Sequence, residues 1–255
     1  AENLLTSLDE DDAETRYVMV DWQMATPFSK FQAPPVFYDR NGTGVQFSDF
    51  ANRIYAQGQN GQFRTALFHR SQRFYESMVT RLYEYHGSAV DPRAVVVDWD
   101  LDSVQTSRGP VTVRVLPEDG QAVRRFQSTQ NATGIERAEA FVANDSTSSI
   151  GGVGQFPSER VEALETYRVV KVSNLTAYNN NKYRRLTRQA ASLTQQAGIG
   201  GTDLTNTVPT WVKLFERVPG ATVEGEAPAN ETVSARVRMQ VPTTNQTFVY
   251  TQYAE

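Results

Sequence analysis

Residues 95–104 read VVVDWDLDSV, and apolar and charged side chains alternate along this segment. Successive side chains of a β-strand point to opposite faces, so a period of two predicts a strand. One face of this strand is predicted to pack on a core, and it consists of Val95, Val97, Trp99 and Leu101. The other face is predicted to carry Val96 and an acidic row formed by Asp98, Asp100 and Asp102.

Further segments carry the strand pattern, and sequences rich in Gly, Pro, Asn and Ser separate them. They are residues 17–24, 111–116, 138–143, 167–173, 208–218, 231–241 and 246–253. The composition agrees, since 25 Thr and 16 Ser favour strands and turns. The sequence therefore predicts a mainly β fold, an antiparallel sandwich or a jelly-roll-like barrel, with an α+β fold as the alternative.

The sequence also predicts one long amphipathic helix, at about residues 62–86. Six large apolar side chains recur there at spacings of three, four and seven, namely Phe63, Leu67, Phe74, Met78, Leu82 and Tyr85. Gly87 follows where a C-terminal cap is expected. We expect this helix to belong to a helical insertion at about 48–87 of a single β-rich domain, residues 16–255, preceded by an N-terminal arm, residues 1–15.

Three carboxylates at alternate positions raise the question of a metal site. Side chains two apart on a strand lie roughly 6.5–7 Å from each other, too far to share a cation unless water or other segments add ligands. A calcium loop that began at Asp98 would need Gly at its sixth and Glu at its twelfth position, where the chain has Ser103 and Gly109. The pattern favours a solvated or partner-facing strand edge, with a metal site as the weaker alternative.

The chain carries few of the groups that catalysis uses. It has no Cys, which excludes disulfides and thiolate nucleophiles, and it lacks the GxSxG, HExxH and GxxxxGK[ST] motifs. His86 is predicted to cap the end of the long helix, and His69 to be a surface or packing residue. Although a Ser–His–Asp triad can assemble from distant positions, we predict no catalytic residue, no metal and no cofactor.

Two clusters of basic residues suggest partner surfaces. Arg236 and Arg238 lie outward on a predicted strand and complement the acidic row, so a subunit interface is predicted at Asp98, Asp100, Asp102, Arg236 and Arg238. A polar segment carries a patch that could meet nucleic acid or an acidic partner, formed by Lys182, Arg184, Arg185 and Arg188. The net charge of −4 disfavours nucleic acid.

Asn-X-Ser/Thr sequons, the acceptor sequence for N-glycosylation, occur six times where about two are expected by chance. They begin at Asn41, Asn131, Asn144, Asn174, Asn230 and Asn245. Loop-rich β structure with Asn in its turns is the alternative explanation. The excess therefore makes glycosylation one of two readings.

These features favour a structural protein over an enzyme. The chain has 21 Arg and 4 Lys, a bias that suits interface ion pairs but that a GC-rich genome also produces. We expect a self-associating subunit of a virus or phage particle, a capsid, turret or tail component located in the virion, whose partners are copies of itself or related subunits. The alternatives are a secreted or surface β-sandwich binding module of carbohydrate or adhesin type, extracellular in location, and a cation-dependent hydrolase. No apolar run approaches the roughly 20 residues that span a bilayer.

Overall fold

The structure is a computed structural model that describes most of the 255 residues. The described residues are 16–27, 30, 44–58, 60–119, 121–176, 181, 184, 210–226, 228, 231–241, 243–244 and 246–254. Strands predominate over helices among them, which confirms the prediction of a mainly β fold. The predicted N-terminal arm lies outside the described residues.

The described strands form four small sheets, and nearly all of their pairings are antiparallel. One sheet has the order β1–β10–β9, with β1 at Tyr17–Asp21, β10 at Val212–Arg217 and β9 at Tyr167–Val172. A second is the hairpin of β11 (Val233–Gln240) and β12 (Thr247–Ala254). The first of these sheets joins segments from both ends of the chain.

The other two sheets are built from the middle of the chain. One has the order β3–β2–β6–β5, with β3 at Phe63–Arg70, β2 at Ala51–Gln57, β6 at Gly109–Val115 and β5 at Asp100–Thr106. In this sheet β2 and β6 are parallel. The last sheet has the order β7–β4–β8, with β7 at Val123–Arg125, β4 at Val95–Asp98 and β8 at Ser148–Ile150.

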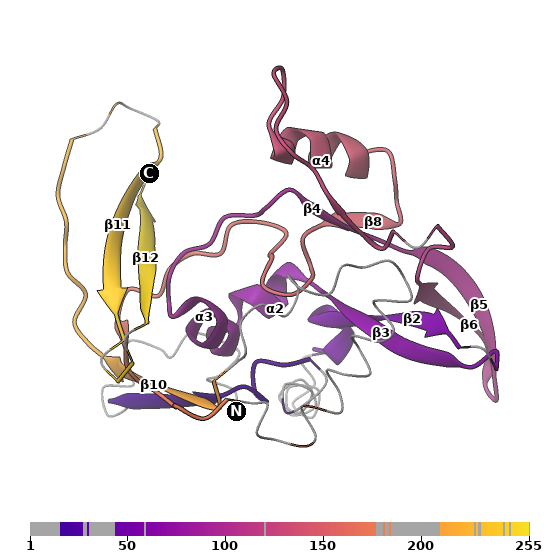
Figure 1. Cartoon of the computed structure of the whole chain (residues 1–255), viewed down its shortest axis with the longest axis horizontal. Coiled ribbons are helices and arrows are strands. Elements are labelled where there is room, and N and C mark those ends of the chain that lie inside the picture. The colour runs from indigo at the N-terminus through magenta and orange to yellow at the C-terminus, as the bar shows by residue number, and fades with distance from the viewer. Residues whose placement is uncertain are drawn as a thin grey trace.

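The helices are short. They are the 3-10 helix η3 at Phe47–Asp49 and the α-helices α2 at Gln72–Glu76, α3 at Met78–Tyr85 and α4 at Gly134–Val142. Figure 1 shows α2 and α3 in the middle of the molecule, with the β11–β12 hairpin on one side and β2, β3, β5 and β6 on the other. No helix among the described residues is long and apolar enough to cross a membrane.

The prediction of one long helix at about 62–86 is wrong. Its first part is the strand β3, which pairs with β2 through the turn that Gly58 and Gln62 close. A spacing of four, as from Phe63 to Leu67, is also a multiple of two, so it fits a strand as well as a helix. The helical insertion at about 48–87 accordingly contains a β-hairpin.

The second part of the predicted helix is helical, and it is broken at Ser77. The backbone of Ser77 has ψ 137°, which ends α2 and starts α3, and its hydroxyl donates to the carbonyl of Phe74. Gly87 follows α3 with φ +82°, and its N–H donates to the carbonyl of Arg81. The predicted C-terminal end of the helix is therefore confirmed, because glycine adopts this conformation without strain.

The opening segment, residues 95–104, is two strands. β4 is buried along its whole length, whereas β5 leaves Leu101 60% exposed. Trp99 stands between them, and its N–H donates to the carbonyl of Thr147. The predicted acidic row is consequently divided, since Asp98 ends one sheet while Asp100 and Asp102 belong to another.

Residues 138–143 are also not the strand that the alternation predicts, because residues 138–142 lie in α4 and Ala143 is its C-cap. The helix begins at a capping box in which Thr133 and Glu136 exchange hydrogen bonds between side chain and backbone. This Thr-x-x-Glu pattern is a helix start signal. Local capping therefore determines the structure here, against a short alternation of apolar residues.

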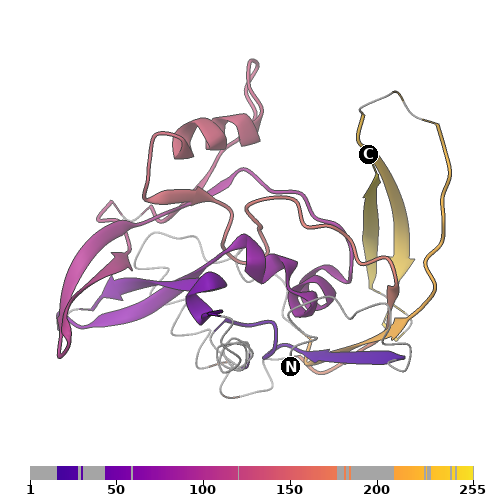
Figure 2. The same ribbon diagram turned by 180° about the vertical axis from the view of Figure 1, so that it is seen from behind.

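Two clusters of buried apolar side chains form the core. The larger one lies between the β1–β10–β9 sheet and the helices α2 and α3, and its fully buried members include Val20, Trp22, Phe74, Tyr75 and Phe215. The smaller one lies where β4 meets β2 and β3 and contains Ile54, Leu67, Val95, Val97, Trp99, Ala122, Val153 and Phe156. Seen from behind, α4 and the β11–β12 hairpin project from the body of the molecule at two separate places (Figure 2).

A glycine substitution tests how tightly the loop after β8 is packed. Gly151 has φ +62°, and a Cβ there would lie 2.2 Å from the carbonyl oxygen of Pro157. Gly61 has a similar φ of +74° but no atom within 4 Å of its Cβ position. We expect Gly61→Ala to cost about 1 kcal/mol through backbone strain, and Gly151→Ala more than about 3 kcal/mol because a clash is added. Urea unfolding of the two variants measures the difference, and equal midpoints would contradict the expectation.

Candidate functional site

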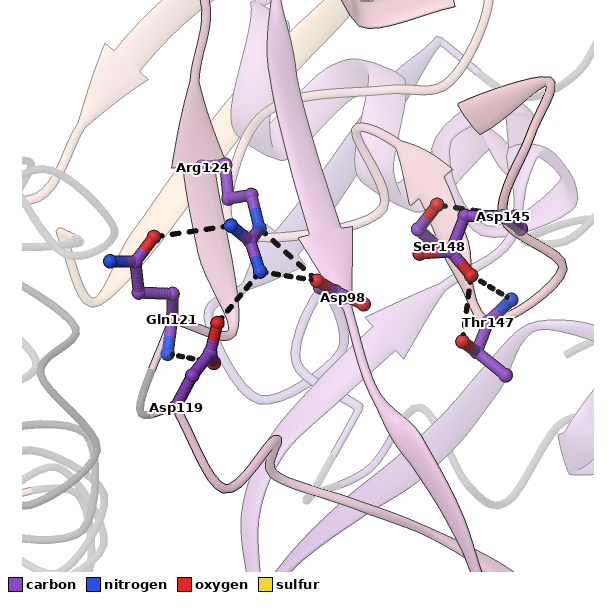
Figure 3. Close-up of polar contacts among 7 residues, drawn as sticks. All are labelled: Asp98, Asp119, Gln121, Arg124, Asp145, Thr147 and Ser148. Carbon is purple, nitrogen blue, oxygen red and sulfur yellow. Dashed lines mark hydrogen bonds and ion pairs between the residues drawn. The ribbon is translucent and has the colours of Figure 1, made fainter. Parts of the chain in front are cut away.

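A polar network that includes a buried carboxylate surrounds Arg124 on β7. The guanidinium donates to the carboxylate of Asp98 on β4 from Nε at 3.1 Å and from Nη2 at 3.0 Å. Nη2 also donates to Asp119 at 2.9 Å, and Nη1 donates to the amide oxygen of Gln121 at 3.2 Å. Figure 3 shows the four side chains converging from β4, β7 and the segment before β7.

The network exists because a carboxylate lies at the buried end of β4. The side chain of Asp98 is only 11% exposed. Burial raises the pKa of Asp98, while the hydrogen bonds and charge of Arg124 oppose that rise. A charged carboxylate in such surroundings requires a paired cation, and Arg124 supplies it from the neighbouring strand.

An open hollow of about 640 Å³ lies beside this network, over α4. Its lining consists of Phe126, Arg137, Ala140, Phe141, Asn144 and Asp145. The rings of Phe126 and Phe141 are 5.5 Å apart between centroids, and the guanidinium of Arg124 lies 5.4 Å from the centre of the Phe141 ring. The hollow therefore presents two aromatic rings together with a cation, an amide and a carboxylate.

Asp145 is held in a fixed orientation at the edge of the hollow. Its carboxylate accepts hydrogen bonds from the backbone N–H and the hydroxyl of Thr147, at 2.9 and 2.8 Å, and Ser148 donates to its carbonyl oxygen (Figure 3). The hydrogen bonds from Thr147 are the largest causes that lower the pKa of Asp145, so this side chain is an anion at neutral pH. A ligand in the hollow would meet a negative oxygen at a defined position.

His69 forms a second polar group on β3. Its Nε2 lies 2.6 Å from the hydroxyl of Ser149, and its Nδ1 lies 2.9 Å from Nη1 of Arg114. A guanidinium can only donate, so Nδ1 accepts and Nε2 carries the proton of the neutral ring. Burial, and then the charge of Arg114, lower the pKa of His69 to about 4. In this tautomer His69 cannot remove a proton from Ser149, so the pair is not arranged as a nucleophile and its base.

His86, at the end of α3, also accepts a hydrogen bond from a cation. Lys213 on β10 donates from its ammonium to Nε2 of His86 at 2.9 Å and to the carbonyl of Tyr83. Burial, followed by the charge of Lys213, lowers the pKa of His86 to about 3, and burial lowers that of Lys213 to about 8. Lys213 is therefore the side chain that caps α3, whereas the ring of His86 packs on Phe248. The predicted capping role belongs to a cation that the sequence does not mark.

The residues of the predicted subunit interface do not lie together in this chain. Asp98 is paired with Arg124, and Asp100 and Asp102 are exposed on β5. Arg236 and Arg238 lie on β11, where the charge of Arg236 helps to lower the pKa of Asp91. Whether any of the five contacts another subunit stays a prediction.

The predicted basic patch is almost entirely outside the described residues. Arg184 is described, and it is exposed and donates to Asn181. Lys182, Arg185 and Arg188 lie outside the described residues, so the contact with nucleic acid or an acidic partner is also untested. The weak metal candidates are separated by the division of their strand, and the described residues contain no group of three or more His, Asp or Glu side chains that could hold a metal ion.

Reasoning from sequence missed Arg124, Phe126, Phe141 and Asp145. Two signals could have indicated them: the capping box that starts α4, and the Asp145-x-Thr147 spacing, in which an aspartate accepts a hydrogen bond from the backbone two residues later. The partnership of Arg124 with Asp98 has no such signal, because it depends on the pairing of β4 with β7.

The comparisons with known proteins give one strong sequence match. No protein-family model matches the chain. Over its full length, however, the chain is 48% identical, across 261 aligned positions, to the dolichyl-monophosphooligosaccharide–protein glycotransferase AglB of Haloferax volcanii. The aligned segment is 24% of that protein, so the chain spans about a quarter of the length of this curated relative.

Solved structures of an oligosaccharyltransferase from Archaeoglobus fulgidus resemble the chain weakly. The complex with zinc and sulfate has a TM-score of 0.49 at 17% identity and matches 99% of this chain and 29% of that one. The archaeal oligosaccharyltransferase AglB in complex with an inhibitory peptide and a dolichol-phosphate has a TM-score of 0.45 at 16% identity and matches 100% and 26% of the two chains.

That match overturns three expectations from the sequence. The virus or phage subunit, the absence of enzymatic function and the location in a virion are all wrong, because the full-length identity is to a glycotransferase. The reason is physical. A β-rich fold with polar Thr- and Asn-rich loops forms its backbone hydrogen bonds in the same way in a capsid subunit and in part of an enzyme. Composition does not distinguish the two.

The charge balance at Asp98 can be tested by a double-mutant cycle. We expect Arg124→Met to destabilise the chain by about 3 kcal/mol, because it leaves a buried carboxylate without its cation. Asp119→Asn removes the exposed partner of the same guanidinium, and we expect it to cost less than about 1 kcal/mol. Adding Asp98→Asn to Arg124→Met should restore part of the loss. Additive costs in urea unfolding would show that the pair is not coupled.

Proposed function

We propose that this chain functions as part of a protein glycosyltransferase of the AglB type. Such an enzyme, by the name of the Haloferax volcanii relative, transfers an oligosaccharide from dolichyl monophosphate to protein. The single observation that carries the proposal is the 48% identity, which extends over the whole chain and not over one motif. Identity of this extent in an alignment that covers the whole chain supports a shared fold and a shared role.

Within that enzyme, we propose that the hollow beside Arg124 contacts the oligosaccharide. Sugars present apolar C–H faces and hydroxyl groups, so they bind where aromatic rings adjoin fixed hydrogen-bonding groups. Phe126 and Phe141 supply the rings, and Arg137, Asn144 and Asp145 supply donors and acceptors around them. The ion pair of Asp98 and Arg124 fixes the strand that leads to Phe126 and positions the Phe141 ring through the guanidinium of Arg124.

The two histidines have a structural role in this proposal. Each is neutral and accepts a hydrogen bond from a cation, His69 from Arg114 and His86 from Lys213. These contacts join β3 to β6 and the end of α3 to β10. The chain accordingly contributes a substrate contact and a rigid support for it.

A segment exchange tests the proposed activity. In a Haloferax volcanii strain that lacks its AglB gene, the aligned segment of AglB is replaced by this chain, and a secreted reporter with one Asn-X-Thr sequon is produced. We expect the hybrid to restore the glycan mass on the reporter, as wild-type AglB does, because the chain supplies the same fold to the same neighbours. AglB with the segment deleted is the negative control. A hybrid that accumulates to the wild-type level but leaves the reporter unmodified would refute the proposal.

The role of the hollow is tested in the same hybrid with Phe141→Ala. An aromatic contact is worth up to about 1.5 kcal/mol, so the lipid-linked donor concentration for half-maximal transfer should rise up to about tenfold while kcat changes little. Glu139→Ala, an exposed position of α4 outside the hollow, is the matched control and should leave both constants unchanged. If the two variants behave alike, the hollow does not contact the donor.

A further inference from the structure

Three of the six sequons lie among the described residues, and they differ in how their asparagines are held. Asn131, Asn144 and Asn174 all have exposed side chains. The sequons at Asn41, Asn230 and Asn245 have asparagines outside the described residues. The three described ones therefore allow a comparison of acceptor geometry within one protein.

Asn131 lies in the loop between β7 and α4, which extends away from the body of the molecule (Figure 1). The loop is closed by the backbone N–H of Thr129, which donates to the carbonyl of Ala132 at 2.8 Å. The Asn131 carboxamide has no hydrogen bond to any described residue. Thr133, the third residue of the sequon, is exposed, and its hydroxyl accepts from the N–H of Glu136, which leaves its own proton free to donate.

Asn174 lies in the bend that follows β9. Its carboxamide likewise makes no hydrogen bond within the described chain, and the neighbouring Leu175 is 58% exposed. The backbone on its C-terminal side is fixed, since the N–H of Trp211 donates to the carbonyl of Leu175 at 2.8 Å and Thr176 pairs with Thr210. The carboxamide is thus accessible and held on a defined bend.

Asn144 is different because its carboxamide already makes a hydrogen bond to the backbone of α4. Its Nδ2 donates to the carbonyl of Ala140 at 2.9 Å and its backbone N–H donates to the carbonyl of Phe141, both in the last turn of α4. The side chain also lines the hollow beside Arg137 and Asp145. Attachment of a sugar to Nδ2 would require the helix end to lose this cap and the hollow to fill.

We propose that the protein is itself N-glycosylated, at Asn131 and Asn174 and not at Asn144. The co-substrate is an oligosaccharide linked through phosphate to a polyprenyl lipid. In the transfer, Nδ2 forms a bond to C1 of the first sugar, the bond between C1 and the phosphate oxygen breaks, and the lipid phosphate leaves as the oxygen anion while the amide loses one proton to a base. No oxidant or further reactant is needed. This inference goes beyond the proposed function, because any enzyme with that donor can modify the chain.

The selection among the three sequons follows from the free energy of exposing each amide. At Asn131 and Asn174 no hydrogen bond to a described residue is lost when Nδ2 enters an active site, whereas at Asn144 the hydrogen bond to Ala140 must be broken and the helix end displaced. Occupancy should therefore separate the two classes in the folded protein. The same geometry predicts that Asn131→Gln and Asn174→Gln leave the urea midpoint of unfolding unchanged.

The experiment uses the full-length protein that carries this chain, produced in Haloferax volcanii with its own AglB gene intact. Protease digestion and mass spectrometry give the occupancy at each sequon, for the wild type and for Asn131→Gln, Asn174→Gln and Asn144→Gln variants. We expect glycopeptides that contain Asn131 and Asn174, an intact mass that falls by one glycan in each of the first two variants, and an unchanged mass in Asn144→Gln.

Unmodified peptides at both Asn131 and Asn174 would overturn the inference, and so would occupancy at Asn144 equal to theirs. These outcomes are separable from failure of the proposed function. If the segment exchange restores the reporter glycan and both asparagines stay unmodified, the inference fails while the function stands. If the exchange fails and both asparagines are occupied in the strain with its own AglB, the function fails while the inference stands.

Discussion

The pairing of Asp98 with Arg124 is the interaction on which the arrangement around the candidate site depends. β4 is buried along its length, so the carboxylate at its end needs a cation that arrives from a neighbouring strand. Arg124 fulfils this need, and in doing so it fixes β7 against β4 and places its guanidinium beside the Phe141 ring of α4. One charge at the end of a buried strand thus connects the sheet, the helix and the hollow between them.

A related electrostatic constraint acts on the two histidines. His69 and His86 are neutral because each ring nitrogen that faces a cation must accept a hydrogen bond, and burial disfavours a second positive charge. The distance between Ser149 and His69 alone suggests nucleophilic catalysis, but the direction of the hydrogen bonds excludes it. Electrostatic neutralisation, and not acid–base chemistry, explains these residues.

The composition of the chain does not predict its function. The composition shows how the chain forms its backbone hydrogen bonds and keeps its surface polar, through Thr-rich strands, polar loops and an excess of Arg over Lys. Many unrelated proteins have the same composition. The full-length identity to a glycotransferase carries information that composition lacks, since it depends on the order of residues. The sequons, in contrast, were visible in the sequence, and the structure distinguishes accessible amides from one that caps a helix.

The sequence by itself determined the mainly β class, the strands with a clear period of two, and the end of α3 at Gly87, because these depend on local side-chain alternation and on one backbone conformation. Only the tertiary structure decided that residues 63–70 are a strand, that residues 95–104 divide at Trp99, and that Asp98 meets Arg124. Apolar residues four positions apart fit both a helix and a strand. The pairing of Asp98 with Arg124, 26 positions later, leaves no pattern in the local sequence. Contacts between distant segments supply the free energy that selects among such alternatives, and local sequence does not contain them.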